Sequence, residues 1–270
     1  MNAVRITANV GIELHGVDLR SPLDSNDVAL LRATIAQYHV VTVRDQFLSG
    51  AQHAAFASSL GPILSSPVQL ATGSSNAAVS TIEDTAQRPP AGFPWHTDLS
   101  WTRHPPALGL LTAVTIPAFG GDTLWASTAA IYDRLTSRDR DLCEHASARH
   151  IPDSTLLESV QRHHGAEIAA RLWREHPGVE HPLVRRNPIT RRRSLFLSPL
   201  YTQRITGPTG LDGTLLQRLN GMLDDPHVHM RWRWRQGDVA IWHETSTCHL
   251  ALTDHHPQHR VMRRCVVGLS

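Results

Sequence analysis

The sequence predicts a mainly β protein with flanking helices. Two strand-rich blocks lie on either side of a helical stretch of roughly fifty residues, and their strand patterns are short and bounded by glycine and proline. Of the 270 residues, 41% are hydrophobic, so the chain can bury a sizeable core. We expect a single domain over residues 1–270, with the helical insert at about 127–180.

The first part of the chain mixes short strands with two helices. Ser49 and Gln52 fit a capping box, which marks the start of the second helix. Residues 65–92 are rich in Ser, Thr, Gly, Ala and Pro, which favours loops and makes this segment a candidate lid. The predicted elements are strands within 3–20, a helix at 24–37, a strand at 40–43, a helix at 49–60 and a strand at 78–82.

Strands dominate again after Trp95. The predicted elements are strands at 108–116 and 123–126, helices within 127–174, strands at 183–185 and 194–197, a short helix at 214–223, and strands at 231–235, 238–242, 247–252 and 260–268. A tight turn at 119–122 separates the first two strands. We expect the last two strands to pair as an antiparallel hairpin.

Composition narrows the function classes. A net charge of +2 does not indicate a nucleic-acid partner, and the Arg-Trp alternation at 231–235 is typical of a strand with one buried side. No apolar run is long enough to span a membrane, and the first twenty residues lack the apolar stretch of a secretory signal. The three cysteines form no CxxC pair. We therefore expect a reducing, cytoplasmic location.

A metal site is the first chemical candidate. On a strand, His96 and Asp98 would point to the same face, and this pair supplies two thirds of a 2-His-1-carboxylate triad for Fe(II). The third ligand must come from elsewhere, and His249 lies in an apolar strand pattern where an imidazole is either a core residue or a ligand. An ordinary hydrogen-bonded pair at 96 and 98 is the alternative.

Two arginines suggest an anion receptor. Arg260 and Arg264 share one face of the last predicted strand, and burying both requires anions, from either a ligand or protein carboxylates. Thr123 follows the glycine turn and places a hydroxyl on the next strand. A hydroxyl together with a guanidinium suits one end of a dicarboxylate.

These parts together resemble the TauD/TfdA family of Fe(II)- and 2-oxoglutarate-dependent dioxygenases. The matching stretches, in the family's order and spacing, are WHTD at 95–98, GGDTLWAS at 120–127, QGDVAIW at 236–242 and the segment 249–264. The resemblance implies a double-stranded β-helix, or jelly-roll, core. It also implies oxidation of a small, anionic organic substrate by O2, with release of succinate and CO2. The substrate is a small molecule, with no nucleic-acid or membrane partner expected, and a homo-oligomer is compatible with the family.

The resemblance assigns roles to individual residues. It implies that the Fe(II) ligands, which are also the catalytic residues, are His96, Asp98 and His249. Thr123 and Arg260 would hold the distal carboxylate of 2-oxoglutarate. The substrate would meet Arg264 through its anionic group, and would also meet Trp101 and the positions occupied by Ser66 and Gln69.

Some positions depart from taurine dioxygenase. Ser66 and Gln69 replace a His and a Tyr of its first lid segment, and Gly92 replaces an Asn. The Trp-Asp-Asn-Arg that commonly precedes the distal His reads WHET at 242–245. A substrate other than taurine is therefore expected, and a tailoring oxygenase acting on an amino-acid-like metabolite remains an alternative. A zinc hydrolase on the same three ligands is a further alternative.

The remaining histidines and cysteines carry less information. His255, His256 and His259 lie in the turn beside the proposed site, where they would line the pocket entrance. Cys248 is expected to point into the core rather than toward the metal.

Overall fold

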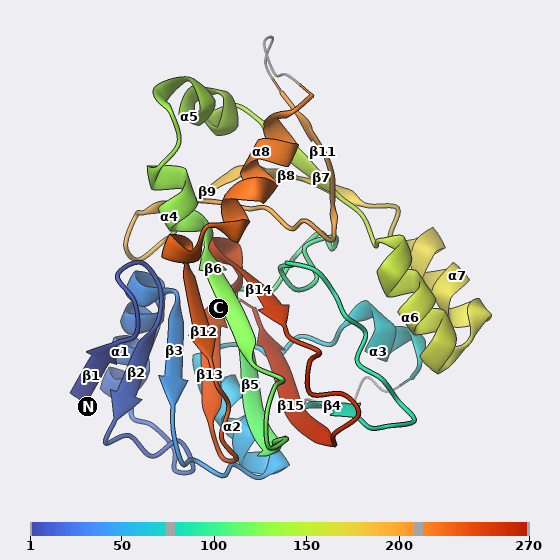
Figure 1. Cartoon of the computed structure of the whole chain (residues 1–270). Coiled ribbons are helices and arrows are strands. Elements are labelled where there is room, and N and C mark those ends of the chain that lie inside the picture. Colours follow the sequence, from blue (N-terminus) through green and yellow to red (C-terminus); the bar gives the residue numbers. More distant parts are fainter. Residues whose placement is uncertain (1, 74–78, 208–212, 269–270) are drawn as a thin grey trace.

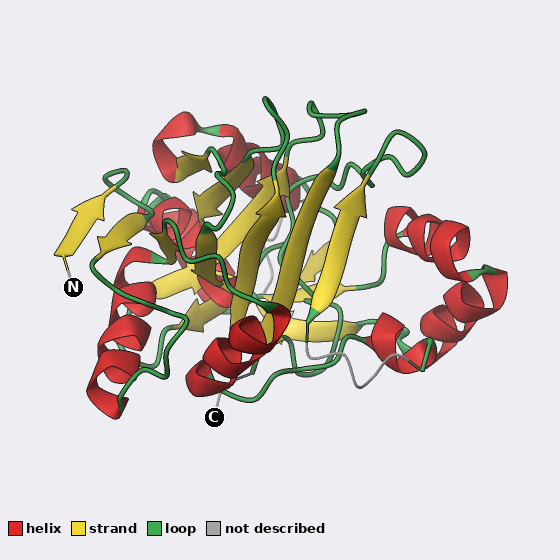
Figure 2. Ribbon diagram, turned by 90° about the horizontal axis from the view of Figure 1, so that it is seen from below, coloured by secondary structure: helices red, strands yellow, loops and turns green. Residues whose placement is uncertain are grey.

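Two β-sheets face each other at the centre of the protein. The computed structural model describes residues 2–73, 79–207 and 213–268 (Figure 1). Strands and loops predominate, and helices lie at the edges and over the outer faces, as the view from below also shows (Figure 2). The predicted class, mainly β with flanking helices, is confirmed. The start of the predicted strand at 78–82 falls outside the described residues.

The larger sheet joins strands that are distant in sequence. Its order is β1 (Asn2–Arg5), β2 (Ile12–His15), β3 (Val40–Val43), β13 (Val239–His243), β5 (Leu108–Thr115), β15 (Arg260–Val267) and β4 (Ser80–Asp84). All neighbouring strands are antiparallel except β2 and β3, which run parallel. The C-terminal strand β15 therefore lies between β5 and β4, with its arginines inside the sheet rather than at an edge.

The smaller sheet corrects one prediction. Its order is β12 (His229–Trp232), β6 (Thr123–Ser127) and β14 (Thr247–Ala251). The expected hairpin of the last two strands is wrong, because β14 pairs with β6 while β15 belongs to the larger sheet. The segment 252–259 exceeds a hairpin loop of about two to five residues and carries the chain from one sheet to the other. This crossover places residues of both strands around one cavity.

Large side chains fill the space between the two sheets. Trp125 of β6 and Trp242 of β13 are fully buried there, with ring centroids 5.7 Å apart. Trp232, Leu111 and Met262 belong to the same cluster. Strand alternation sends the neighbours of Trp242 to the opposite face of the larger sheet. This packing gives the floor of the site a rigid support.

Two helices cover the outer face of the larger sheet. These helices are α1 (Ser25–Tyr38) and α2 (Gly50–Leu60), close to their predicted bounds. Leu31 and Ile35 are buried in the cluster that also holds Leu110 of β5, as the helical pattern predicts. The capping box of Ser49 and Gln52 is present at the start of α2. Local sequence signals therefore located these helices well.

The remaining helices are α3 (Pro67–Ala71), α4 (Thr128–Asp133), α5 (Ser137–Glu144), α6 (Ser154–His164), α7 (Ala166–Glu175) and α8 (Leu215–Gly221), with short 3-10 turns at Met222–Asp224, Pro226–Val228 and Glu244–Ser246.

The helical insert contains a strand that was not predicted from the sequence. The prediction of helix throughout 127–174 is wrong at β7 (Ser147–His150), which pairs with β8 (Val179–Pro182) and β11 (Thr202–Thr206). Ala148 and His150 alternate with less buried neighbours, a two-residue period that continuous helix cannot satisfy. A two-stranded ladder joins β9 (Val184–Arg186) to β10 (Arg193–Leu195).

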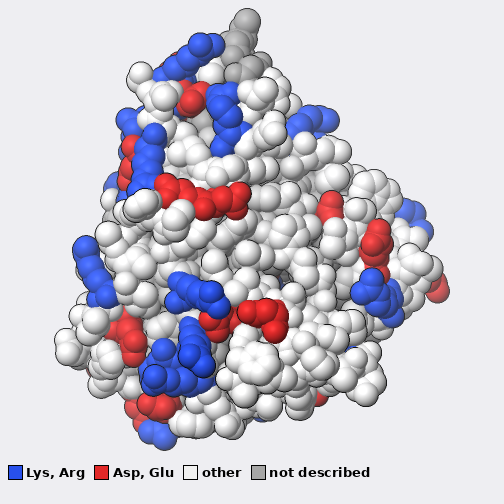
Figure 3. All heavy atoms as spheres, viewed as in Figure 1, with Lys and Arg blue, Asp and Glu red and all other residues white. Residues whose placement is uncertain are grey.

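The Arg-Trp run has one buried side, as predicted, although regular strand ends at Trp232. Trp232 and Trp234 are buried, whereas Arg231, Arg233 and Arg235 are exposed. On the face shown in Figure 3, basic and acidic side chains lie interspersed. Within the described ranges, no helix has the length and apolar character needed to cross a bilayer.

Candidate metal centre

A backbone pairing brings the two distant histidines together. The amide of His96 donates to the carbonyl of His249 at 3.0 Å, and the reverse bond measures 2.8 Å. This is an isolated bridge between the 95–98 segment and β14. His96 was expected on a regular strand, and that expectation is wrong. Asp98 lies in the turn that follows. The two segments are thus held in register by the same kind of bond that builds a sheet.

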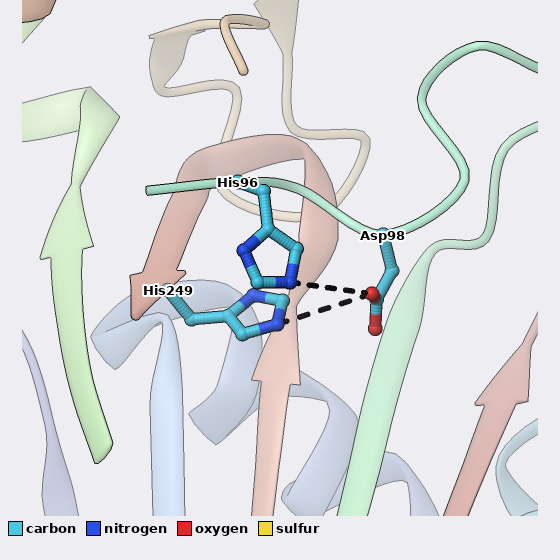
Figure 4. A group of neighbouring side chains, drawn as sticks. All are labelled: His96, Asp98 and His249. Carbon is cyan, nitrogen blue, oxygen red and sulfur yellow. Dashed lines mark ion pairs between the residues drawn. The ribbon is translucent and has the colours of Figure 1, made fainter. Parts of the chain in front are cut away.

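Three side chains converge at this bridge (Figure 4). The Nε2 atoms of His96 and His249 each lie 3.9 Å from Oδ1 of Asp98. One ligand atom from each residue falls within 4.8 Å of the others, and all three residues are buried. The geometry therefore allows a single ion to contact two imidazoles and one carboxylate, the donor set of the 2-His-1-carboxylate triad.

The surroundings of these three residues favour the protonation states in which they can bind a metal ion. Burial lowers the pKa of His96 and His249, so both imidazoles are neutral at pH 7. Burial acts to raise the pKa of Asp98, but the Arg264 guanidinium beside it outweighs burial and holds that pKa below its usual range. His96 Nδ1 lies 2.8 Å from the carbonyl of Pro94, which leaves Nε2 for the ion. Neutral imidazoles and an ionised carboxylate fit Fe(II).

Arg264 contacts the second oxygen of the same carboxylate. Its Nε donates to Oδ2 of Asp98 at 2.9 Å, and its Nη2 forms an ion pair with that oxygen. The two carboxylate oxygens of Asp98 therefore have different neighbours: Oδ1 faces the imidazoles and Oδ2 faces the guanidinium. Arg264 also lines the cavity, so it can orient Asp98 and still meet a substrate.

Glu244 supports the turn that carries Asp98. From the sequence, this residue was noted only as a departure from the family pattern. It is 1% exposed, and its Oε2 accepts a hydrogen bond from the amide of Asp98 at 3.0 Å. Burial, together with the nearby charge of Asp98, raises the pKa of Glu244 well above its usual value. The side chain is therefore a neutral acid that fixes the turn carrying Asp98. No residue spacing signals this role, because the contact is long-range.

We expect Glu244→Gln to keep Fe(II) affinity and activity within about threefold of wild type, because an amide mimics a protonated carboxyl. Glu244→Leu should weaken Fe(II) binding by about tenfold, since it leaves the Asp98 amide buried without an acceptor, a loss of about 1–3 kcal/mol. Metal titration of both variants checks this. Equal affinity in the two variants would show that the hydrogen bond does not position the ligand.

The triad lies in a cavity of about 340 Å³. Most of the residues proposed from sequence line it: His96, Asp98, His249, Thr123, Arg260, Arg264, Trp101 and Ser66. Gln69 lies outside this lining, because its side chain completes a capping box with Ser66 and donates to Ser80 at 3.0 Å. Sequence analysis missed Asp84, Phe93, Leu156 and Tyr201, which carry no motif and reach the cavity only through the fold.

Arg260 and Thr123 face the cavity from two different sheets. Arg260 on β15 is 4% exposed, and Thr123 on β6 is 1% exposed. The indole of Trp234 donates to the Thr123 hydroxyl oxygen at 2.9 Å, so the hydroxyl proton remains available for a ligand. A buried guanidinium beside an available hydroxyl is a receptor for a carboxylate.

Facing sheets with this triad and a carboxylate receptor define a class, the non-haem iron oxygenases. The chain belongs to the family described as "Taurine catabolism dioxygenase TauD, TfdA family", whose model matches residues 3–266. It is a 2-oxoglutarate-dependent dioxygenase, and its cofactors are Fe(II), 2-oxoglutarate and O2. Membership of this family favours 2-oxoglutarate-dependent oxidation over the alternative of zinc-dependent hydrolysis.

Similar proteins span nearly the whole chain. An alkylsulfatase of Acinetobacter baylyi is 30% identical over 275 residues, covering 98% of this chain and 84% of that protein. An alpha-ketoglutarate-dependent sulfate ester dioxygenase of Pseudomonas putida is 30% identical over 272 residues, covering 97% and 88%. The crystal structure of a taurine dioxygenase from Burkholderia xenovorans matches with a TM-score of 0.80 at 30% identity, covering 100% and 91%. The predicted jelly-roll core is confirmed by this likeness.

Proposed function

We propose that this dioxygenase oxidises a C–H bond of a small organic anion with a hydrocarbon body, and that Arg264 binds the anionic group. One observation carries the proposal: the cavity that holds the triad combines the Arg264 guanidinium with a largely apolar wall. The names of the two relatives, an alkylsulfatase and a sulfate ester dioxygenase, favour a sulfate ester or a sulfonate as the anion.

Each residue has a separate task in this proposal. His96, Asp98 and His249 hold Fe(II), which when bound supplies O2 activation coupled to the conversion of 2-oxoglutarate to succinate and CO2. Arg260 and Thr123 hold the distal carboxylate of 2-oxoglutarate. The protein itself contributes positioning and the exclusion of water from the reacting centre.

The hydrocarbon part of the substrate would occupy the apolar wall. Its side chains come from several elements and include Val68, Phe93, Leu99, Trp101 and Leu156. Ser66, at the N-terminal cap of α3, contributes a neutral hydroxyl. Gln69 supports Ser66, because its Oε1 accepts a hydrogen bond from the Ser66 backbone amide at 2.8 Å. Arg264 is thus the cation offered to the substrate beside the metal.

A panel of substrates tests this proposal by succinate formation above the rate without substrate. We expect coupled turnover with short alkyl sulfates or alkanesulfonates, and at least tenfold less with the corresponding neutral alcohols, because a charge-assisted contact contributes about 1.5–3 kcal/mol. Taurine and amino acids complete the panel and test the tailoring alternative. Coupling to neutral compounds as efficient as coupling to anions would contradict the role of Arg264.

We also propose that the enzyme works in the cytoplasm with only small molecules as partners. Cys143, Cys248 and Cys265 are all buried thiols, which suits a reducing compartment. Cys248 packs in the core and donates to the Leu197 carbonyl, as its strand position suggests. Separation of cell fractions followed by activity measurement tests the location.

A further inference from the structure

We propose that His255 is a third binding residue for the distal carboxylate of 2-oxoglutarate, beside Arg260 and Thr123. The inference rests on the use of 2-oxoglutarate by this chain. His255 lies in the crossover between β14 and β15, is 1% exposed and lines the cavity together with the other two residues. The sequence led us to expect His255 at the pocket entrance. The residue is instead buried against the cavity.

A carboxylate on β4 holds His255 next to Arg260. The Nε2 atom of His255 lies 3.3 Å from Oδ2 of Asp84, and Nη1 of Arg260 lies 3.7 Å from the same oxygen. The absence of a side chain at Gly121 leaves room for both: a Cβ built there would be only 3.1 Å from the Arg260 Nε and 3.2 Å from the His255 Nδ1. With φ at +72°, this position also favours glycine. The backbone thus packs the imidazole and the guanidinium side by side.

Three buried nitrogens of this cluster have no hydrogen-bond partner among the described residues. Arg260 Nε is buried and unpartnered within the described part of the chain. Neither ring nitrogen of His255 makes a hydrogen bond there, although Nε2 faces Asp84. Buried donors without acceptors are costly, so this group of atoms indicates a missing anionic ligand rather than a finished core.

The charges point to the same ligand. Asp84 and Arg260 cancel each other, so the distal carboxylate of 2-oxoglutarate would add an uncompensated negative charge. An N–H group of the buried His255 ring would share this charge with the Arg260 guanidinium through a hydrogen bond. Two other carboxylates near this turn have partners of their own, since Asp254 accepts from the Gly121 amide at 2.9 Å and Asp122 accepts from Arg231 at 2.7 Å. We therefore assign His255 as a hydrogen-bond donor to the distal carboxylate in the 2-oxoglutarate complex.

Equilibrium binding to the Mn(II)-loaded enzyme tests the assignment without turnover. The two probes are 2-oxoglutarate and 2-oxopentanoate, which has the same keto-acid end but no distal carboxylate. We expect His255→Ala to weaken binding of 2-oxoglutarate by about tenfold and to change binding of 2-oxopentanoate by less than about twofold.

His259→Ala is the matched control. His259 belongs to the same turn, but it is exposed and its Nε2 lies 2.9 Å from Glu83. This variant should bind both probes like wild type. His255→Asn keeps a polar side chain and repeats the comparison if the alanine variant does not fold.

Unchanged affinity of the His255 variants for 2-oxoglutarate would overturn the assignment, as would equal weakening for both keto acids. Failure of the wild-type, metal-loaded enzyme to bind 2-oxoglutarate would instead contradict the dioxygenase assignment itself.

Discussion

Replacing His249 with alanine is expected to abolish tight Fe(II) binding and to lower succinate formation by at least about a thousandfold. The remaining His96 and Asp98 would leave the ion with two protein ligands, too few to hold it in the facial geometry of the triad. The fold should persist, because the backbone bonds between His96 and residue 249 do not involve the lost imidazole. Metal content after dialysis, measured beside circular dichroism, checks both parts.

His163→Ala provides the control for this variant. His163 is an exposed histidine of α6, and its Nδ1 meets only the Ser159 carbonyl in the described structure, at 2.8 Å. It should retain Fe(II) and activity at wild-type levels. A His249→Ala protein that still binds one equivalent of Fe(II) tightly and turns over 2-oxoglutarate would contradict the ligand assignment. Loss of metal together with loss of the folded spectrum would instead indicate a structural role for the imidazole.

The sequence indicated the site well because its key parts are local patterns. WHTD at 95–98 places an imidazole and a carboxylate two residues apart, a spacing that brings them to one side of an extended segment, and the turn at 119–122 leads directly to Thr123. The structure shows that the first pattern works through a bridge and a turn rather than through a strand. Local spacing therefore predicted residues that the structure brings together, although the expected backbone was inexact.

Contacts made across the chain could not be predicted in this way. Glu244 meets the amide of Asp98, and Asp84 meets Arg260, only after β13, β4 and β15 have assembled. The mistaken hairpin of the last two strands has the same origin. Sequence shows that strands are present, whereas pairing depends on which faces are buried between the sheets. The missed strand β7 is stabilised by two distant partners rather than by local propensity.

Several buried histidines outside the metal centre make stability depend on pH. Burial lowers the pKa of His39 and His150 to about 3, and that of His53 and His243 to about 4. Their hydrogen-bond partners are neutral or cationic, such as the Ser100 hydroxyl 3.0 Å from His150 Nδ1, and the Ser246 hydroxyl and the Arg192 guanidinium, which lie 2.8 Å from Nδ1 and 3.3 Å from Nε2 of His39. An added proton in the folded state would find no compensating carboxylate among these partners.

The expected result is a steep loss of stability between pH 6.5 and pH 4. In this range the unfolded chain binds protons at these histidines and the folded chain does not, so the free energy of unfolding falls as the pH falls. Each histidine contributes about 1.4 kcal/mol per pH unit, and the set lowers the free energy of unfolding by roughly 4–8 kcal/mol between pH 7 and pH 5. Such a change is comparable with the whole stability of a typical domain, about 5–15 kcal/mol.

Denaturant unfolding at a series of pH values, with the metal content held constant, measures this slope. His53→Gln should reduce it by close to one proton, because His53 is buried on α2 and its ring meets only the Thr112 hydroxyl in the described structure, at 2.9 Å. His163→Gln, at the exposed position on α6, should leave the slope unchanged. A wild-type curve that is flat from pH 7 to pH 5 would mean that these imidazoles take up protons in the folded state, which the neutral and cationic groups around them give no reason to expect.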